Sequence, residues 1–297
     1  MIVESAVASA GDRFKTKVAA YAAFVKVRLT FLVVISSVIG YGIGAASFSW
    51  LDAFWLVLGG FLVTGASNGF NQIIEKDFDA LMKRTADRPL PQGKMSVPEA
   101  LIFGALMAVV GLAVLYFLFN TLAAVLGALA LFSYVFVYTP MKRASNLAVF
   151  AGAFPGAIPP MLGYVAATGQ FDLCAGLLFA VQFVWQFPHF WAIAWVSHAD
   201  YSKAGYRLLP SRGEKDGHSA FLILLYTLFL IPVSLLPWAF GLTGVFSAWA
   251  GAALGIGFAM PAVQLFFRKN DLAAKRVMFA SFLYLPLILI VYLIDKV

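Results

Sequence analysis

The sequence predicts an all-α, polytopic membrane protein with nine transmembrane helices around a central cavity. Of the 297 residues, 62% are hydrophobic and only 12% are charged, and the mean hydropathy is +0.88. A water-soluble domain could not cover its outside with so few polar side chains. Because the bilayer core offers the backbone no water, the spanning segments must be helices rather than strands. We therefore expect one integral membrane domain over residues 1–297.

Nine apolar stretches are long enough to cross a hydrocarbon core, which takes roughly 20 residues of helix. They cover residues 29–49, 53–74, 98–118, 120–138, 148–168, 172–195, 219–240, 243–266 and 274–294. The connections between these stretches alternate in character. The first, third, fifth and seventh are short and almost uncharged, at 50–52, 119, 169–171 and 241–242. The second, fourth, sixth and eighth are polar, at 75–97, 139–147, 196–218 and 267–276. This alternation is expected of a chain that crosses the membrane nine times.

The distribution of lysine and arginine predicts the orientation. All but one of the 21 bases lie in the N-terminal segment through Arg28 or in the polar connections, and only Lys296 lies on the other side. Cytoplasmic connections carry the excess of bases in membrane proteins. We therefore expect the segment 1–26 and the polar connections in the cytoplasm and the C-terminus outside. The first 28 residues have no separate apolar core, so we expect no signal peptide. The N-terminal segment contains Glu4 and Asp12 and is not rich in Arg or Ser, so we expect the cell inner membrane of a bacterium rather than an organelle.

Composition and loop lengths also limit which partners the protein can have and where its functional surface lies. The net charge of +7 follows from this sorting of bases, so we expect no nucleic-acid partner. The single cysteine, Cys174, lies within an apolar stretch, which excludes a disulfide framework. The polar loops 75–97 and 196–218 follow the second and sixth helices, as in a degenerate repeat with one loop per half. We therefore expect the functional surface at the cytoplasmic mouth of a cavity between the halves.

The stretch NQIIEKDFDALMKRTADRPLPQG, residues 71–93, concentrates charge at the inner end of the second helix. If the helix continues through this end, Asn71, Glu75 and Asp79 fall on one stripe, because they are spaced by four residues. A row of amide and carboxylate oxygens suits a hard cation such as Mg²⁺, which shares phosphate oxygens with a substrate. The stripe therefore predicts a magnesium site.

Bases follow these acids directly. Arg84 and Arg88 are one helical turn apart, before Pro89 and Pro91 stop any helix. Arginine binds phosphate oxygens through paired hydrogen bonds. Acids that hold a metal beside such arginines predict a diphosphate site, whereas Lys83 taken singly is explained as an interfacial anchor.

Four stretches carry a resemblance to a known family. The stretch NQIIEKDFDALMKRTADRPLPQGKMS resembles the first acidic motif of the UbiA superfamily of intramembrane prenyltransferases, N-x-x-x-D-x-x-x-D with R-x-x-x-R-P. Its variant, with Gln72 after Asn71 and Glu75 in the middle position, resembles the branch of protohaem IX farnesyltransferases, or haem O synthases. The other stretches that agree are YTPMKRASN at 138–146, PGAIPPMLGYVAATG at 155–169 and WQFPHFWAIAWVSHADYSKAGYRLLP at 185–210.

The resemblance implies a reaction and its participants. Farnesyl diphosphate, haem B and water would give haem O and diphosphate, with the farnesyl carbon joined to a porphyrin vinyl group. The implied cofactor is Mg²⁺, and the implied partners are the two substrates, the lipid bilayer and proteins that handle haem or assemble oxidases. The implied metal-holding and catalytic residues are Asn71, Glu75, Asp79 and Asp200. The implied diphosphate-binding residues are Arg84, Arg88, Lys142 and Arg143.

Two positions of the second half have alternatives. Asp200 stands alone where related branches place two or three aspartates, so a plain helix-end charge is the alternative, and Glu214 or Asp216 could supply a further carboxylate. His189 lies within the sixth helix after Pro188, at a depth where an ionisable side chain usually has a partner or a function. We expect it to bind or orient the haem, and a hydrogen bond across helices is the alternative.

Two other functions stay open. One is a prenyltransferase that acts on a phenolic or quinone precursor. The other is a secondary transporter, because such proteins also show broken helices and two related halves. A transporter needs its polar site near the midplane, whereas this chain gathers its acids and bases at one face.

Overall fold

The structure is a computed structural model that describes residues 10–297, with side chains from residue 14 onward. Within this part all regular elements are helices, and nine of them are long and apolar enough to cross a membrane. The prediction of an all-α, polytopic membrane fold is therefore confirmed. Large hydrophobic side chains are exposed along these helices, and Trp50, Phe117 and Trp249 are each at least three-quarters exposed. Such side chains face lipid.

The spanning helices follow the order of the apolar stretches. They are α2 (Val27–Gly44), α3 (Trp50–Ile74), α5 (Val97–Leu118), α6 (Thr121–Phe132), α8 (Ala148–Thr168), α9 (Leu173–Val196), α11 (Gly217–Ala239), α12 (Val245–Arg268) and α13 (Asp271–Ile294). Most of their ends lie within three residues of the expected ones, but α2 ends at Gly44 rather than at 49. The fourth span does not end with α6 and runs on to Ala144. The start of α13 comes three residues early because the Asn270 side chain caps it, accepting a hydrogen bond from the backbone N of Ala273 at 2.9 Å.

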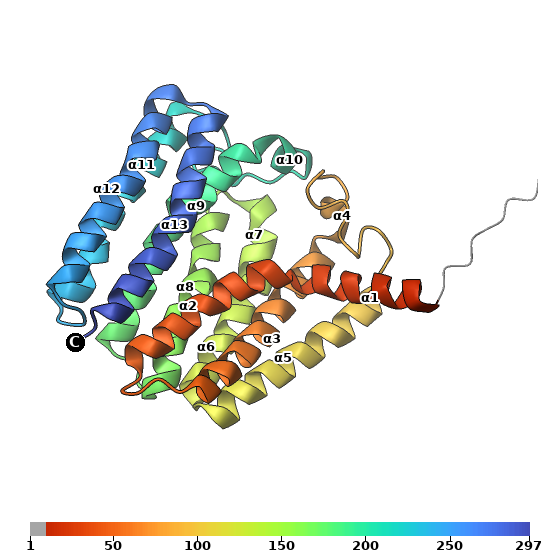
Figure 1. Cartoon of the computed structure of the whole chain (residues 1–297). Coiled ribbons are helices and arrows are strands. Elements are labelled where there is room, and N and C mark those ends of the chain that lie inside the picture. The colour runs from red at the N-terminus through yellow and green to blue at the C-terminus, as the bar shows by residue number, and fades with distance from the viewer. Residues whose placement is uncertain (1–9) are drawn as a thin grey trace, which may run out of the picture.

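Shorter elements gather at one end of the molecule. The helix α1 (Ala10–Val25) precedes α2, α4 (Lys76–Asp79) follows α3, and α10 (His198–Lys203) follows α9. At the same end α6 continues through a π-helical turn, Ser133–Tyr138, into α7 (Thr139–Ala144). The C-terminus lies at the opposite end (Figure 1). The polar loops 75–97 and 196–218 thus meet at one end. The segment 1–26 was expected only as a cytoplasmic segment, and its described part contains the helix α1.

The spanning helices form a closed arrangement with α8 inside it. One side is built from α3, α5 and α6 and the other from α11, α12 and α13, with α8 and α9 between them (Figure 1). The ring closes where α2 contacts α13 as well as α3. More than three-quarters of the α8 membrane span is buried by its neighbours. The functional end is therefore held by helices from both halves of the chain.

Backbone contact between α2 and α8 makes this arrangement dense. A Cβ atom at Gly163 would lie 1.8 Å from the carbonyl oxygen of Ser37, and one at Gly40 would lie 2.0 Å from that of Pro160. Small residues let transmembrane helices approach closely, and here only glycine fits. Because α2 carries the junction to α1, this contact also fixes where that junction lies.

The end of the bundle opposite the polar loops is tied together by the last residues of the chain. Lys296 Nζ donates to the carbonyl oxygens of Gly42 and Ala45, at 2.8 and 2.7 Å, and so satisfies carbonyls at the end of α2. The neighbouring Asp295 accepts a hydrogen bond from the backbone N of Ser247 at 2.6 Å, at the start of α12. Lys296 is therefore a cap of α2.

We expect Gly163→Ala to destabilise the protein, because its methyl group would push α2 and α8 apart. Overpacking of this kind costs about 1–3 kcal/mol. Gly176→Ala is the matched control, because a Cβ at this glycine of α9 has nothing within 4 Å. Thermal unfolding in detergent should show a lower midpoint for Gly163→Ala than for Gly176→Ala. Equal midpoints would contradict the close approach.

Candidate functional site

The acidic stripe lies across a short break in the second membrane helix. The expected continuous helix is wrong in this detail, because α3 ends at Ile74 and Glu75, with φ −94° and ψ 6°, joins it to α4. Hydrogen bonds nevertheless follow the helical pattern along the stripe: Glu75 N donates to Asn71 O at 3.0 Å and Asp79 N donates to Glu75 O at 2.8 Å. The side chains of Asn71, Glu75 and Asp79 therefore share one buried face.

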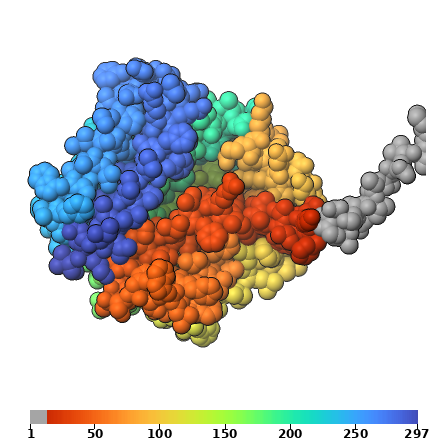
Figure 2. Space-filling view, viewed as in Figure 1, coloured from red at the N-terminus to blue at the C-terminus, as the bar shows by residue number. Residues whose placement is uncertain are grey.

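These three side chains line a polar cavity of about 120 Å³ at the end that carries the polar loops. Figure 2 shows a recess on this side of the molecule, between α2, α13 and the connection that carries α4. The cavity walls come from the α1–α2 junction, α3, α4, the α6–α7 turn and the segments after α4 and α10. The lining residues are Lys26, Asn71, Glu75, Asp79, Met82, Arg84, Arg88, Tyr134, Tyr138, Lys142, Tyr201, Tyr206 and Leu208.

Two buried acid–base pairs organise this cavity. Lys142 Nζ lies 2.8 Å from Glu75 Oε1, and Arg88 Nη1 lies 2.6 Å from Asp79 Oδ2. Burial acts to raise the pKa of Glu75, but the Lys142 ammonium outweighs it and holds this pKa below its usual value. Burial raises the pKa of Asp79 despite the opposing guanidinium of Arg88. The two carboxylates therefore differ in how strongly their charge is stabilised.

The two bases Lys142 and Arg143, which were expected to bind diphosphate together, lie in different environments. Lys142 faces the cavity, with its ammonium 4.6 Å from the ring centroid of Tyr138. The guanidinium of Arg143 lies over the ring of Phe78, 4.0 Å from the centroid, and Arg143 is not part of the cavity lining. Of the two bases, only Lys142 can reach a ligand here without rearrangement.

Asp200 lies beside the cavity and connects the two polar loops. Its Oδ2 accepts a hydrogen bond from the backbone N of Arg84 at 3.2 Å, and its Oδ1 lies 3.4 Å from Lys203 Nζ. The hydrogen bond from Arg84 and the charge of Lys203 hold the pKa of Asp200 below its usual value, although its limited burial acts in the other direction. Arg84 itself lines the cavity and donates to the hydroxyl of Tyr201 at 3.4 Å. Asp200 therefore positions a cavity-lining base in this structure.

The alternative carboxylates of the second loop lie elsewhere. Glu214 Oε2 is 3.7 Å from His198 Nε2. Asp216 caps α11 by accepting a hydrogen bond from the backbone N of Ser219 at 2.8 Å. Neither side chain lines the cavity.

His189 lies on α9, away from this cavity, in a well-defined environment. Its Nδ1 is 2.7 Å from Ser281 Oγ, which itself donates to the carbonyl oxygen of Met278 at 2.6 Å. Because the serine proton is used in that bond, Ser281 accepts from Nδ1–H of the imidazole, and the lone pair of the ring lies on Nε2. The ring stacks on Trp185, with centroids 4.4 Å apart. The histidine therefore has a fixed orientation and a free acceptor nitrogen among the described residues.

The residues that sequence reasoning missed are Lys26 and the four tyrosines of the cavity. Tyr134, Tyr138, Tyr201 and Tyr206 reach it from two segments far apart in the chain. Burial and the nearby carboxylate of Glu75 raise the pKa of Tyr206, so its phenol stays protonated. Tyr138, Tyr201 and Tyr206 lie within stretches that carry the family resemblance, which is the signal that could have marked them. Their spacing alone does not show that the fold brings them to the acidic stripe.

The donor set fits a hard cation. Among residues 10–297 no three His, Cys, Asp or Glu side chains come together as metal ligands. The amide of Asn71 and the carboxylates of Glu75 and Asp79 nevertheless share the cavity, and Asp79 Oδ1 is buried without a hydrogen-bond partner. Mg²⁺ is commonly held by one or two carboxylates, with waters and substrate phosphates completing its octahedral shell. The stripe can therefore hold Mg²⁺ together with a phosphate ligand.

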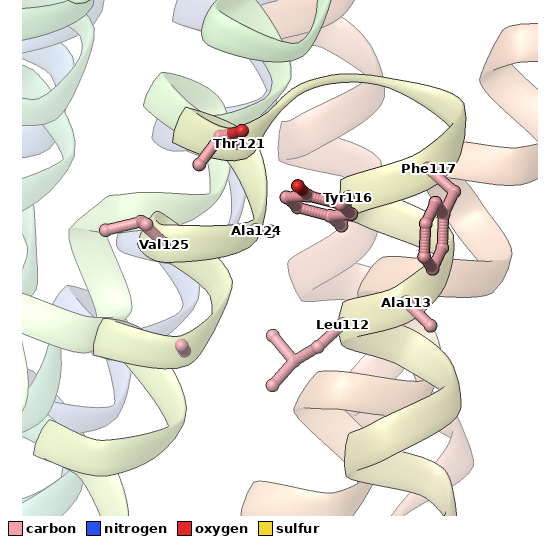
Figure 3. A pocket seen from close by; sticks show the side chains of 8 residues that line it. Leu112, Ala113, Tyr116, Phe117, Thr121, Ala124 and Val125 are labelled. Atoms are coloured by element: carbon pink, nitrogen blue, oxygen red, sulfur yellow. The ribbon is translucent and has the colours of Figure 1, made fainter.

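A second hollow has a different character. It is a groove of about 450 Å³ between α5 and α6, lined by Leu112, Ala113, Tyr116, Phe117, Thr121, Ala124, Val125 and Ala128. Figure 3 shows these side chains on the two helices beside their tight connection. The groove offers no acid and no base, and it lies on membrane-spanning segments, so it suits lipid chains rather than a charged substrate.

Comparison with known proteins identifies the family of the chain. The pattern of the UbiA prenyltransferase family matches residues 33–285. A protein named protoheme IX farnesyltransferase from Cytophaga hutchinsonii is 45% identical over 94% of this chain and 98% of its own. A protein of the same name from Christiangramia forsetii is 49% identical over 91% of each chain.

Two solved structures share the fold. A digeranylgeranylglyceryl phosphate synthase superposes with a TM-score of 0.77 at 20% identity, over 94% of this chain and 98% of its own. A UbiA homolog from Archaeoglobus fulgidus bound to DMAPP and Mg²⁺ superposes with a TM-score of 0.70 at 14% identity, over 92% of this chain and 98% of its own. With the family pattern extending over most of its length, the chain belongs to the UbiA prenyltransferase family.

Proposed function

We propose that this membrane transferase moves the farnesyl group of farnesyl diphosphate onto a vinyl group of protohaem IX (haem B). Water adds in the same reaction, and the products are haem O and diphosphate. The relatives that are 45% and 49% identical to the chain carry the name of this activity. The observation that carries the proposal is one cavity in which Asn71, Glu75 and Asp79 lie together with Arg88 and Lys142.

The chemistry requires a stabilised leaving group. When the allylic C–O bond breaks, its electron pair leaves with the diphosphate and the farnesyl carbon becomes electron-poor. We propose that Asn71, Glu75 and Asp79 hold Mg²⁺, which would supply positive charge to the diphosphate oxygens. Arg88 and Lys142 would then bind the diphosphate instead of the carboxylates with which they pair in this structure.

The remaining walls of the cavity suit the electron-poor allylic carbon that is left when the C–O bond breaks. Tyr134, Tyr138, Tyr201 and Tyr206 line the cavity, and aromatic faces attract a developing cation. Met82 and Leu208 add apolar surface that limits access of water to the reactive carbon. The aromatic walls would therefore shield the allylic carbon until it joins the acceptor.

Three further residues of the proposed diphosphate site differ in how they lie relative to the cavity. Arg84 lines the cavity and can bind diphosphate directly. We infer that Asp200 acts on the same ligand through Arg84, and its service as a metal ligand stays a prediction. The diphosphate-binding role of Arg143 also stays a prediction, because its guanidinium lies over Phe78.

His189 is proposed to bind or orient the haem. Its Nδ1–H is held by Ser281, which leaves the Nε2 lone pair available as an iron ligand or hydrogen-bond acceptor. A ligating histidine whose other nitrogen is hydrogen-bonded keeps its ring orientation. The location in the cell inner membrane, with the cavity at the cytoplasmic face, is part of the same proposal and is supported by the distribution of bases.

The direct test uses purified protein with haem B, farnesyl diphosphate and Mg²⁺, with haem O detected by mass spectrometry. A phenolic acceptor offered in parallel separates the alternative prenyltransferase activity. Haem O together with released diphosphate is the expected result. Prenylation of the phenol alone would contradict the proposal. So would transport of a solute in proteoliposomes without release of diphosphate, although neither the relatives nor the one-ended cavity favour a transporter.

We expect Asp79→Asn to lower kcat by roughly 100-fold or more, the usual cost of losing one preorganised electrostatic group. The variant should also need more Mg²⁺ for half-maximal turnover. Asp77→Asn is the matched control, because Asp77 is exposed and lies outside the cavity. Magnesium titration of steady-state rates makes the comparison, and near-normal turnover of Asp79→Asn would rule out the metal site.

We expect His189→Ala to weaken haem binding more than diphosphate binding, because the imidazole does not line the cavity of the acid–base pairs and faces the acceptor in our proposal. Absorbance titration with haem B and calorimetry with diphosphate measure the two affinities. His218→Ala, at an exposed position at the start of α11, is the control. Unchanged haem affinity and spectrum in His189→Ala would reduce the histidine to a packing residue.

A further inference from the structure

Lys26 occupies an unusual position at the junction between α1 and α2. Its backbone has φ 51° and ψ 57°, the left-handed region that side chains other than glycine seldom adopt. The side chain lines the polar cavity, yet no described residue forms an ion pair or a side-chain hydrogen bond with its ammonium. A strained backbone and an unpaired cation in the same residue call for a functional explanation.

The junction is held by α3. Gln72 Nε2 donates to the carbonyl oxygens of Phe24 and Ala23, at 2.6 and 3.3 Å, and so satisfies carbonyls at the end of α1. Thr30 Oγ1 donates to Val25 O at 2.7 Å and accepts from Asn68 Nδ2 at 3.1 Å. The same helix that carries the acidic stripe therefore fixes the turn at which Lys26 enters the cavity.

Packing supports the same junction. A Cβ atom at Gly69 would lie 2.3 Å from the ring of Phe24, so the phenylalanine sits directly on the backbone of α3. Phe24 is fully buried. The residue two positions before Lys26 is thus locked, and the left-handed turn follows from a surrounding structure that leaves it little freedom.

The charges of the cavity leave Lys26 without a counter-ion. Both carboxylates of the lining, Glu75 and Asp79, are already paired with Lys142 and Arg88. Burial lowers the pKa of Lys26 well below its usual value, and the charges of Arg88 and Lys142 lower it further. The charges of Glu75 and Asp79 act in the other direction without reversing this shift. An anion that entered the cavity would stabilise the ammonium of Lys26.

We propose that Lys26 is a further diphosphate-binding residue, held toward the cavity by Asn68 and Gln72 before the donor arrives. The inference rests on the proposed function and adds a residue to its donor site. A diphosphate fits better than a haem propionate, because the cavity is small and combines Lys26 with Arg84, Arg88, Lys142 and the magnesium-type oxygen ligands. Released diphosphate carries one more negative charge than the donor, so an additional cation also favours bond cleavage.

The test compares Lys26→Gln with Lys94→Gln, a control at an exposed lysine outside the cavity. Calorimetry with inorganic diphosphate and Mg²⁺ should show affinity at least tenfold weaker for Lys26→Gln and unchanged for Lys94→Gln. Haem B affinity should be unchanged in both, and Lys26→Arg should recover most of the loss. If Lys26→Gln does not fold, Lys26→Asn serves instead, because asparagine tolerates the left-handed region.

Normal diphosphate affinity in folded Lys26→Gln would overturn the inference, and so would a loss of haem affinity in place of diphosphate affinity. These failures are distinguishable from failure of the proposed function, in which wild-type protein would neither bind diphosphate nor form haem O. Gln72→Leu tests the positioning: it should weaken diphosphate binding with haem affinity unchanged, and add little to the effect of Lys26→Gln in the double variant. Fully additive losses would contradict the role of Gln72.

Discussion

The site depends on the need of buried charges for partners. Glu75 and Asp79 carry their charge inside a membrane protein, where an unpaired carboxylate would be neutralised or would destabilise the fold. Lys142 and Arg88 meet that need, and removing one member of such a buried pair typically costs about 3–5 kcal/mol. In the proposed function, a metal that took the two carboxylates would free Lys142 and Arg88 for an anion. The same four side chains would then serve both the stability of the fold and the recognition of the ligand.

This arrangement requires segments that are distant in the chain to meet at one end of the bundle. Glu75 comes from the break between α3 and α4, Asp79 from α4, Lys142 from α7 and Arg88 from the loop after α4. Close packing of α2 on α8 brings the α1–α2 junction to the same place, and Gln72 then ties that junction to α3. The glycine contacts in the membrane and the polar groups at its surface are therefore parts of one construction.

Much of this could be predicted from the sequence. Hydropathy located the nine helices of residues 10–297 that are long and apolar enough to cross a membrane. Four-residue spacing placed Asn71, Glu75 and Asp79 on one face, because helical periodicity is a local property. The separation of Lys142 from Arg143 could not be predicted, since it depends on the ring of Phe78 from another segment. Lys26 was counted only as one of many cytoplasmic bases, because nothing in its neighbours along the chain shows that α3 turns it inward.

The tie at the opposite end has a consequence for the cell. Lys296 and Asp295 join the ends of α2, α12 and α13, and the connections there are short. A cavity rich in ionisable groups could conduct protons if water reached it from both compartments. The hydrogen bonds of Lys296 and Asp295 hold the helix ends together on the side away from the cavity. A bundle tied in this way disfavours a continuous file of water, and with it a leak of protons, across the bilayer.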